Sequence, residues 1–256
     1  MNTILQETAH RPWPMLTGSW VMAQTWHDLL FAHWPVDERK LRALIPERLE
    51  IDKFEGQAWL AVVPFRMTGV RLRATPAVPW LSAFPEMNVR TYVKSGGKPG
   101  VWFFSLDAGN SLAVAIARAW FHLPYFRARM RCSERQGWIE YDSQRSHSGT
   151  AAATLQMRYR PVGPAFFPQP GTLAHFLTER YCFYTTDGQG RLIRGEIHHL
   201  PWRLQLAEAE FEGNTMAESL DVALTAQPLL HFARRQDVLV WPPRRLSAPA
   251  NGSLAS

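Results

Sequence analysis

The sequence predicts an α+β protein that is mainly antiparallel β-structure with a few short helices. Most of the chain consists of short alternating or apolar segments, and clusters of Gly, Pro, Asn, Asp and Ser separate them. Strong helix signals are confined to three short stretches. The chain has no internal repeat and lacks the regular strand-helix alternation that is typical of a parallel α/β fold.

The bulk properties indicate a globular chain. With 256 residues, 46% of them hydrophobic, the chain can bury a large core. We expect one domain over residues 1–243 and a disordered tail, rich in Ser and Ala, over residues 244–256. No basic segment followed by an apolar one opens the sequence, and no apolar run reaches the roughly 18 residues needed to cross a bilayer. A cytoplasmic location without a membrane partner is therefore expected.

The charged residues and cysteines exclude further classes of protein. The net charge of +6 comes from 24 Arg and only four Lys, and the arginines are spread singly through strands and turns. A nucleic-acid partner is not expected, because such binding usually requires a cluster of basic side chains on one face. Cys132 and Cys182 are too few for a disulfide framework and lie in no CxxC pair, so we expect both to be reduced residues of strands or core.

The first third of the chain begins with an arm, residues 1–15, that we expect to lie over the body. Residues 19–34 predict one or two strands, with a helix as the alternative. Residues 37–45 have the signals of a helix, namely Asp37 as N-cap, acidic residues in the first turn and a proline after the end. Strands over 49–51 and 58–67 follow. Residues 71–84 form a loop long enough for a lid, with Trp80 as a capping side chain.

The central stretch, residues 85–130, organises the rest. Residues 86–94 and 101–106 predict two strands joined by a Gly-rich hairpin turn. In the helix that follows, residues 112–121, every residue is apolar except Arg118, which predicts a helix buried nearly all round. A buried guanidinium keeps its charge and needs an anionic partner. Glu86, Asp107 and a bound carboxylate are the alternatives.

The remaining segments predict a continuing antiparallel sheet. The expected elements are strands over 126–132, 138–144 and 151–159, a Pro-rich loop over 161–170, a helix over 172–180 capped by Thr172, a hairpin over 181–199, a strand over 202–211, a helical turn over 215–220 and a last strand over 229–241.

Two segments resemble acetoacetate decarboxylases. ERKLRALIPERLEID (38–52) is similar to their early helix-proline-strand segment, and SLDAGNSLAVAIARAWFHLPY (105–125) resembles a strand-helix stretch in which a helical Arg precedes, by six residues, the proline before the catalytic lysine. Arg118 and Pro124 match this spacing. Tyr125 stands where the Schiff-base lysine is expected.

The chain more closely resembles the YqjF-like bacterial proteins, a family of unknown function in the same superfamily. The matching segments are PEMNVRTYV (85–93), GVWFFSLDA (100–108), LPY (123–125), FLTERYCFYT (176–185) and HHLPW (198–202). The resemblance implies a closed, cone-shaped antiparallel β-barrel, a pocket near the Arg118 helix and an assembly of several subunits. It does not imply decarboxylation.

Several polar residues are candidates for the site. Strand alternation places Glu86, Asn88 and Arg90 on one face, which lines either a pocket or solvent. Arg118 and His122 are four residues apart on a helix, so the pair could bind a carboxylate and supply a proton, although His122 could instead cap the helix.

The histidines, lysines and known motifs narrow the chemistry. His198 and His199 face opposite ways on a strand and cannot both bind one metal; we choose His199 as the pocket residue. The four lysines lie in turns or in a charged helix start, so none suits imine formation, whereas Tyr125 could donate a proton. No metal, nucleotide or serine-triad motif occurs, and we expect no cofactor.

The resulting hypothesis is an enzyme that binds a small carbonyl- or carboxylate-bearing metabolite, with Arg118 orienting the anion. Glu86, Tyr125 or a histidine would perform acid-base chemistry. The alternative is a non-catalytic metabolite-binding or sensor protein that uses the same pocket, and the sequence alone does not separate the two.

Overall fold

The computed structural model describes residues 2–77, 82–111, 114, 118 and 120–247, and within them thirteen strands form one mainly antiparallel sheet. The strands are β1 (Met22–Val36), β2 (Glu50–Ile51), β3 (Ala58–Leu72), β4 (Phe84–Ser95), β5 (Lys98–Ala108), β6 (Tyr125–Arg135), β7 (Trp138–Arg145), β8 (Thr154–Phe166), β9 (Cys182–Thr186), β10 (Leu192–His198), β11 (Leu204–Asn214), β12 (Leu229–Val240) and β13 (Arg244–Arg245). The helical elements are α1 (Asn2–Gln6), α2 (Glu38–Arg42), α4 (Leu173–Thr178) and the 3-10 helix η1 (Glu218–Leu220). The expectation of a mainly antiparallel β protein with a few short helices is confirmed.

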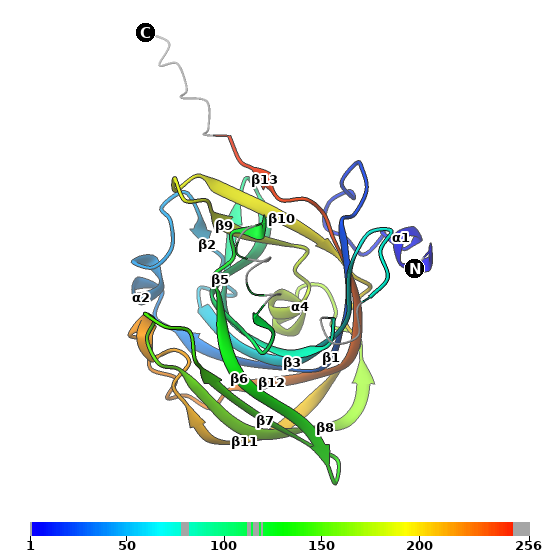
Figure 1. Cartoon of the computed structure of the whole chain (residues 1–256). Helices are drawn as coiled ribbons and strands as arrows, with labels where there is room; N and C mark the ends of the chain where they lie inside the picture. Colours follow the sequence, from blue (N-terminus) through cyan, green and yellow to red (C-terminus); the bar gives the residue numbers. More distant parts are fainter. Residues whose placement is uncertain (1, 78–81, 112–113, 115–117, 119, 248–256) are drawn as a thin grey trace.

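The strands pair in two closed rings, because two different paths from strand to neighbouring strand lead back to the strand where they began (Figure 1). One route runs through β5, β6, β7, β8, β11, β12, β1, β3 and β4, which pairs with β5 again. The other runs from β5 through β9 and β10 to β12, because β5 pairs with β9 and β10 pairs with β12. Strands β12, β1, β3, β4 and β5 belong to both rings, so each of their two faces is covered by a different set of strands.

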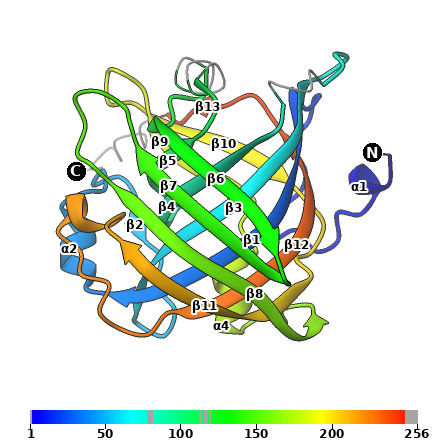
Figure 2. The same cartoon turned by 60° about the horizontal axis from the view of Figure 1, so that its bottom comes forward.

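One face of the shared strands packs against β6, β7, β8 and β11, of which β6, β7 and β8 lie side by side in Figure 2. Its core contains Met87 and Val89 of β4 together with Tyr141 and Tyr159. The Tyr141 hydroxyl donates to the carbonyl oxygens of Glu86 (2.6 Å) and Phe65 (3.2 Å). This packed core therefore holds the main chain of β4 in place from behind.

The other face of the shared strands looks toward β9, β10 and α4. Leu29 and Phe31 of β1 and Val63 and Phe65 of β3 are buried there in a second apolar cluster that includes Trp202. Because residues alternate between faces, β4 contributes its even-numbered residues to this side and its odd-numbered ones to the packed core.

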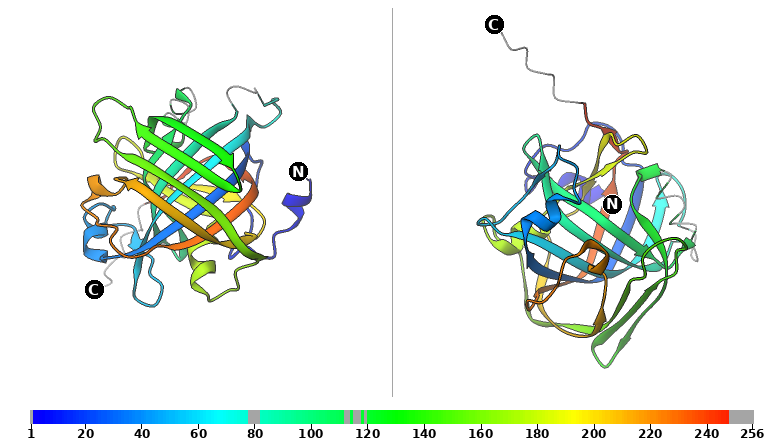
Figure 3. Two further views of the ribbon diagram at one scale, coloured as in Figure 1. Left: turned by 90° about the horizontal axis from the view of Figure 1, so that it is seen from below. Right: turned by 90° about the vertical axis from the view of Figure 1, so that its left-hand side faces the viewer.

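The N-terminal arm lies against β10, as the sequence analysis expected. The Arg11 guanidinium donates to the carbonyl oxygen of Ile197 (2.8 Å), and an imidazole nitrogen of His10 lies 2.9 Å from the carbonyl oxygen of His199. Figure 3 shows α1 outside the strands, at the edge of the molecule.

The predicted helix caps and hairpins are confirmed. The Asp37 side chain accepts a hydrogen bond from the Arg39 amide (2.9 Å) at the start of α2, and Thr172 accepts one from the His175 amide (3.3 Å) at the start of α4. The β4–β5 and β9–β10 hairpins form where the Gly-rich turns predict them. Cys132 and Cys182 are free thiols on β6 and β9.

Three differences from the expected boundaries bear on the fold. Residues 161–166 are not a loop but the end of β8, where Pro161 lies opposite Ala207 of β11. A proline is tolerated in a strand where its missing amide hydrogen is not needed by the neighbour. Arg244 and Arg245 do not begin a tail, because they pair with Arg194 and Ile193 as β13. The loop expected from residue 71 begins later, since β3 runs to Leu72; Trp80 and residues 248–256 lie outside the described residues.

No helix among the described residues is long and apolar enough to cross a membrane.

The contact between β5 and β9 depends on a glycine. A Cβ atom added at Gly100 would lie 2.6 Å from the Cys182 Sγ and 2.7 Å from the Cys182 carbonyl oxygen. We expect Gly100→Ala to lower the free energy of unfolding by about 1–3 kcal/mol, because the strands must move apart. Gly188→Ala, where nothing lies within 4 Å, should change it by less than about 0.5 kcal/mol. Urea unfolding of both variants measures the difference, and equal midpoints would contradict the close approach.

Candidate functional site

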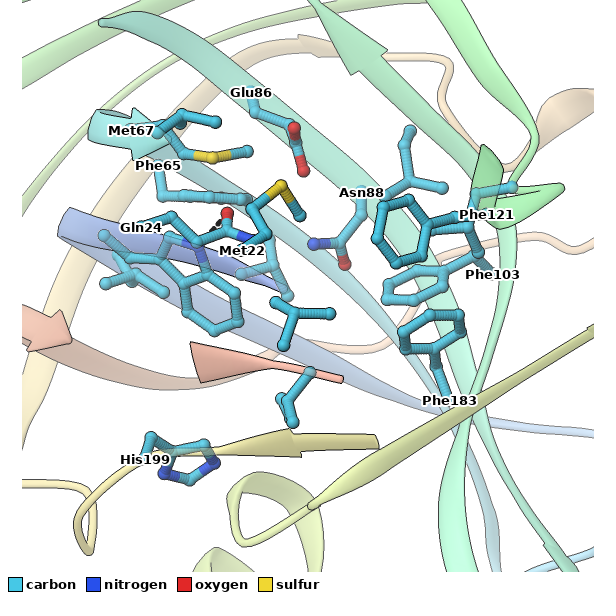
Figure 4. Close-up of a pocket in the computed structure, with 18 of the residues that line it drawn as sticks. Met22, Gln24, Phe65, Met67, Glu86, Asn88, Phe103, Phe121, Phe183 and His199 are labelled. Atoms are coloured by element: carbon cyan, nitrogen blue, oxygen red, sulfur yellow. Dashed lines mark hydrogen bonds between the residues drawn. The ribbon is translucent and has the colours of Figure 1, made fainter. Parts of the chain in front are cut away.

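A cavity of about 360 Å³ lies between the shared strands and the β9–β10 hairpin. Its walls are mostly apolar and aromatic; Figure 4 shows Met22, Phe65 and Met67 on one side and Phe103, Phe121 and Phe183 on the other. The volume is within the roughly 300–1,000 Å³ that is typical of small-molecule sites. The fold therefore provides an apolar cavity rather than a solid interior on this side of the sheet.

Strand β4 supplies a row of polar side chains to this chamber. Glu86, Asn88 and Arg90 all line the cavity, whereas Met87 and Val89 point into the packed core behind the strand. Figure 4 shows the side chains of Glu86 and Asn88 directed into the space between the two walls. Of the two alternatives for this face, pocket or solvent, the structure has the pocket.

The Glu86 carboxyl and the Tyr125 hydroxyl form the most unusual contact in the cavity. Tyr125, at the start of β6, donates a hydrogen bond of 3.0 Å to Oε2 of Glu86, whose exposed fraction is only 3%. Burial raises the pKa of Glu86 to about 8; the nearby Asp107 charge adds to this, and the Tyr125 hydrogen bond opposes it. Burial also raises the pKa of Tyr125 well above its usual value. Both groups are therefore mainly protonated at neutral pH.

Asp107 lies behind this pair and has its own partner. The Arg145 guanidinium donates to Oδ1 of Asp107 from Nη2 (2.8 Å) and to both of its oxygens from Nε (3.1 Å). Both side chains are almost fully buried. This bidentate pair is a structural ion pair, and it is Arg145, not Arg118, that neutralises Asp107.

The expectation that Arg118 is buried, either paired with Glu86 or Asp107 or facing a pocket, is wrong. Arg118 is exposed and does not line the cavity; its Nη1 donates a hydrogen bond of 2.8 Å to the carbonyl oxygen of Tyr125. Among the described residues of this helix, Val114 and Phe121 are buried, whereas Trp120 is exposed like Arg118. An apolar stretch does not by itself decide burial, because folded proteins expose much apolar surface. Arg118 therefore contacts the site through the main chain of Tyr125.

His122 also lies outside the cavity. It is exposed, it has a positive φ of 53°, and its carbonyl oxygen accepts a hydrogen bond of 2.6 Å from the Thr185 hydroxyl. A left-handed residue ends a helix, so the chain turns here toward β6. Of the two alternatives for His122, the structure has the residue at the end of the helix and not the pocket pair with Arg118.

The choice of His199 over His198 agrees with where the structure places them. His199 lines the cavity, whereas the Nε2 atom of His198 lies 2.6 Å from the carbonyl oxygen of Ile4 in the N-terminal arm. The two ring nitrogens of His199 lie 2.8 and 3.3 Å from the carbonyl oxygens of Leu200 and Arg180. Burial lowers the pKa of His199. His199 is thus a neutral part of the wall whose nitrogens already contact the main chain.

Several lining residues were missed by the sequence analysis. Gln24 faces the cavity from β1 and accepts a hydrogen bond of 2.9 Å from the Trp26 indole. Arg180 lines the cavity after α4, and its Nη1 is paired with Asp52 at 2.6 Å. Alternation in residues 22–26 was the available signal for Gln24; Arg180 lies within the FLTERYCFYT segment, whose position in the fold only the tertiary structure supplies.

Within the part of the chain that the structure describes, no group of three or more His, Cys, Asp or Glu side chains is arranged to hold a metal ion.

The architecture is shared with solved structures of the acetoacetate decarboxylase type. The enduracididine biosynthesis enzyme MppR complexed with pyruvate matches with a TM-score of 0.62 and 13% identity, over 93% of this chain and 95% of that one. An acetoacetate decarboxylase matches with a TM-score of 0.60 and 12% identity, over 96% and 98%. At this identity the likeness shows the fold alone. The chain thus has an acetoacetate decarboxylase-like fold.

Sequence comparison then gives the family. Residues 23–237 match the family described as "Uncharacterized conserved protein" (DUF2071). The chain is 49% identical over 231 residues to "Uncharacterized protein YqjF" of Bacillus subtilis (strain 168), covering 90% of this chain and 94% of the relative. The chain belongs to this YqjF-like DUF2071 family, and the resemblance found in the sequence is confirmed.

The raised pKa of Glu86 makes a prediction about stability. Between its usual pKa of 4.5 and the folded value of about 8, the unfolded chain is ionised while the folded chain holds the proton, so stability falls as pH rises through this window. The amide of Glu86→Gln does not titrate in this pH range, and its carbonyl oxygen can still accept the hydrogen bond from Tyr125. We expect the variant to gain stability over the wild type by up to about 1.4 kcal/mol per pH unit across the window.

Thermal and urea unfolding at pH 5, 6.5 and 8 measure this gain. The matched control is Glu212→Gln, since Glu212 is exposed on β11. A stability difference between Glu86→Gln and the wild type that stays the same at all three pH values would show that Glu86 ionises normally.

Proposed function

We propose that this protein binds a small carbonyl- or carboxylate-bearing molecule in the cavity and acts on it by acid-base chemistry without a covalent amine. The observation that supports this most is the buried Glu86 carboxyl, which is protonated at neutral pH and held by the Tyr125 hydroxyl inside an apolar chamber. We also infer that the chamber is the interior of a closed, cone-shaped barrel; the ring of strand pairings supports this inference.

The pair suits a carbonyl group. Because Tyr125 donates to Oε2, the acidic proton of Glu86 is free to reside on the other oxygen and to point into the cavity. A neutral carboxyl there can donate to a carbonyl oxygen and stabilise negative charge that develops on it, which low polarity strengthens. Above pH 8 the same group, as a carboxylate, can accept a proton from the carbon beside the carbonyl.

A Schiff base is not part of the proposal. None of the four lysines lines the cavity, and each lies in an ion pair elsewhere: Lys40 with Asp221, Lys53 with Glu38, Lys94 with Glu50 and Lys98 with Glu196. Tyr125 occupies the position that the family resemblance assigns to the lysine, and a phenol cannot form an imine. We therefore propose that the chain is not an acetoacetate decarboxylase, although MppR, of similar fold, was solved with pyruvate.

Arg118 has a smaller part in this proposal than the sequence suggested. Its hydrogen bond to the Tyr125 carbonyl oxygen makes it a positioning residue for the tyrosine rather than a ligand of the substrate. A cytoplasmic location and a homo-oligomeric assembly remain predictions from the sequence.

The second candidate is a non-catalytic binding or sensor protein with the same pocket. Two other polar groups of the cavity wall favour this candidate, because they already have partners within the protein. Arg180 is paired with Asp52, and both His199 ring nitrogens contact main-chain oxygens. Such a protein would need the cavity and its polar row but not the proton of Glu86.

Turnover separates the two candidates. The purified protein is incubated with a pool of keto acids, aldehydes and hydroxy acids, and mass spectrometry follows each compound. For an enzyme we expect one compound to be consumed, with the rate reduced by about 10²-fold or more in Glu86→Gln and Tyr125→Phe and unchanged in Glu212→Gln.

Thermal stabilisation is measured on the same pool. A compound that stabilises the protein and is recovered unchanged supports the sensor. If no compound of the pool is consumed and none stabilises the protein, both candidates are contradicted.

A further inference from the structure

Three polar atoms of the cavity residues have no hydrogen-bond partner. They are Oδ1 of Asn88, Nε of Arg90 and Nε1 of Trp202. Asn88 and Trp202 are only 6% and 2% exposed, so water does not cover them freely. More than nine in ten buried polar groups normally have a partner, and orphaned ones in a cavity indicate where a bound molecule offers complementary groups.

Arg90 lines the cavity, as do Arg71 and Arg180. Arg180 is paired with Asp52, but no ion pair between Arg90 and an acidic residue occurs among the described residues. Instead, its Cζ atom lies 5.5 Å from the centre of the Phe31 ring and 5.9 Å from that of Tyr92. Ring faces offset only part of the cost of burying a charge that arginine cannot lose.

Glu86 does not supply the missing charge. It lies four residues from Arg90 along β4, which corresponds to about 13 Å of strand, and it is protonated at neutral pH. Along β4 the polar row therefore has a guanidinium at Arg90 and a neutral acid at Glu86, which Tyr125 contacts, with the Asn88 amide between them.

The walls between these ends match an apolar body. The ring centres of Phe31 and Trp202 lie 4.9 Å apart in an edge-to-face contact, and those of Trp26 and Phe65 lie 5.6 Å apart. Across the cavity, the ring centre of Phe183 lies 6.2 Å from that of Phe103 and 6.5 Å from that of Phe121. A three-carbon acid would leave most of this surface uncovered, whereas an aromatic ring would contact both groups of side chains.

We infer that the ligand is a monocarboxylic acid with a bulky apolar, preferably aromatic, body, whose carboxylate pairs with Arg90. This inference rests on the proposed function for the location of the site. It adds the chemical class of the ligand and the orientation of the ligand in the cavity. The carboxylate lies at the Arg90 end, so the group that Glu86 and Tyr125 act on lies at the opposite end of the molecule.

Calorimetry with matched probes tests the inference on the unmodified protein. The probes are 4-phenylbutanoate, 4-phenylbutanamide, 4-phenylbutan-1-ol and pyruvate, at pH 6.5. We expect the phenyl acid to bind at least 10-fold more tightly than the amide, the alcohol and pyruvate. Equal binding of the phenyl acid and its amide would overturn the inference without any variant being needed.

Two variants then locate the carboxylate. In Arg90→Met, which keeps length but removes the charge, the acid should lose its advantage over the amide while the amide binds as before. Arg129→Met is the matched control, since Arg129 is exposed on β6, and the preference for the acid should persist there. A preference that survives Arg90→Met would overturn the assignment.

The outcomes separate this inference from the proposed function. If pyruvate binds and the phenyl compounds do not, the ligand class is wrong while a small-molecule site stands. If none of the four probes binds and the pool of keto acids, aldehydes and hydroxy acids has no effect either, both fail.

Discussion

The alternation of side chains along β4 is the constraint on which the site depends. Because β4 belongs to both rings of paired strands, neither of its faces can reach solvent freely. Met87 and Val89 fill the packed core, and Glu86, Asn88 and Arg90 must then enter the other interior. A shift of register by one residue would exchange the two sets and place charge in the packed core. The Tyr141 hydroxyl, bound to the Glu86 carbonyl oxygen, helps to hold this register.

The burial of Glu86 in the cavity wall determines whether its carboxyl is ionised. In water, a carboxyl beside a tyrosine hydroxyl would be ionised at neutral pH, since that hydrogen bond favours the charged form. Here the loss of hydration outweighs the hydrogen bond, and the pKa of Glu86 rises to about 8. The same apolar walls that keep the proton on Glu86 would also hold the body of the proposed ligand.

Four arginines near the site differ in role because their surroundings differ. Arg145 and Arg180 are buried with carboxylates, Asp107 and Asp52, and stabilise the fold around the cavity. Arg118 is exposed and holds the main chain of Tyr125. A fourth, Arg90, faces the cavity against aromatic rings. No difference in residue type separates them; what differs is whether another segment of the chain places an acidic side chain beside the guanidinium.

The sequence by itself determined the features that depend on near neighbours along the chain. Strand alternation placed Glu86, Asn88 and Arg90 on one face, the caps at Asp37 and Thr172 positioned two helices, and the Gly-rich turns marked the hairpins. The family was also recognisable from its motifs. The tertiary structure alone decided that Arg118 is exposed, that Arg145 neutralises Asp107 and that Glu86 meets Tyr125. Burial and pairing depend on which distant segments pack together, and periodicity within one segment does not contain that information.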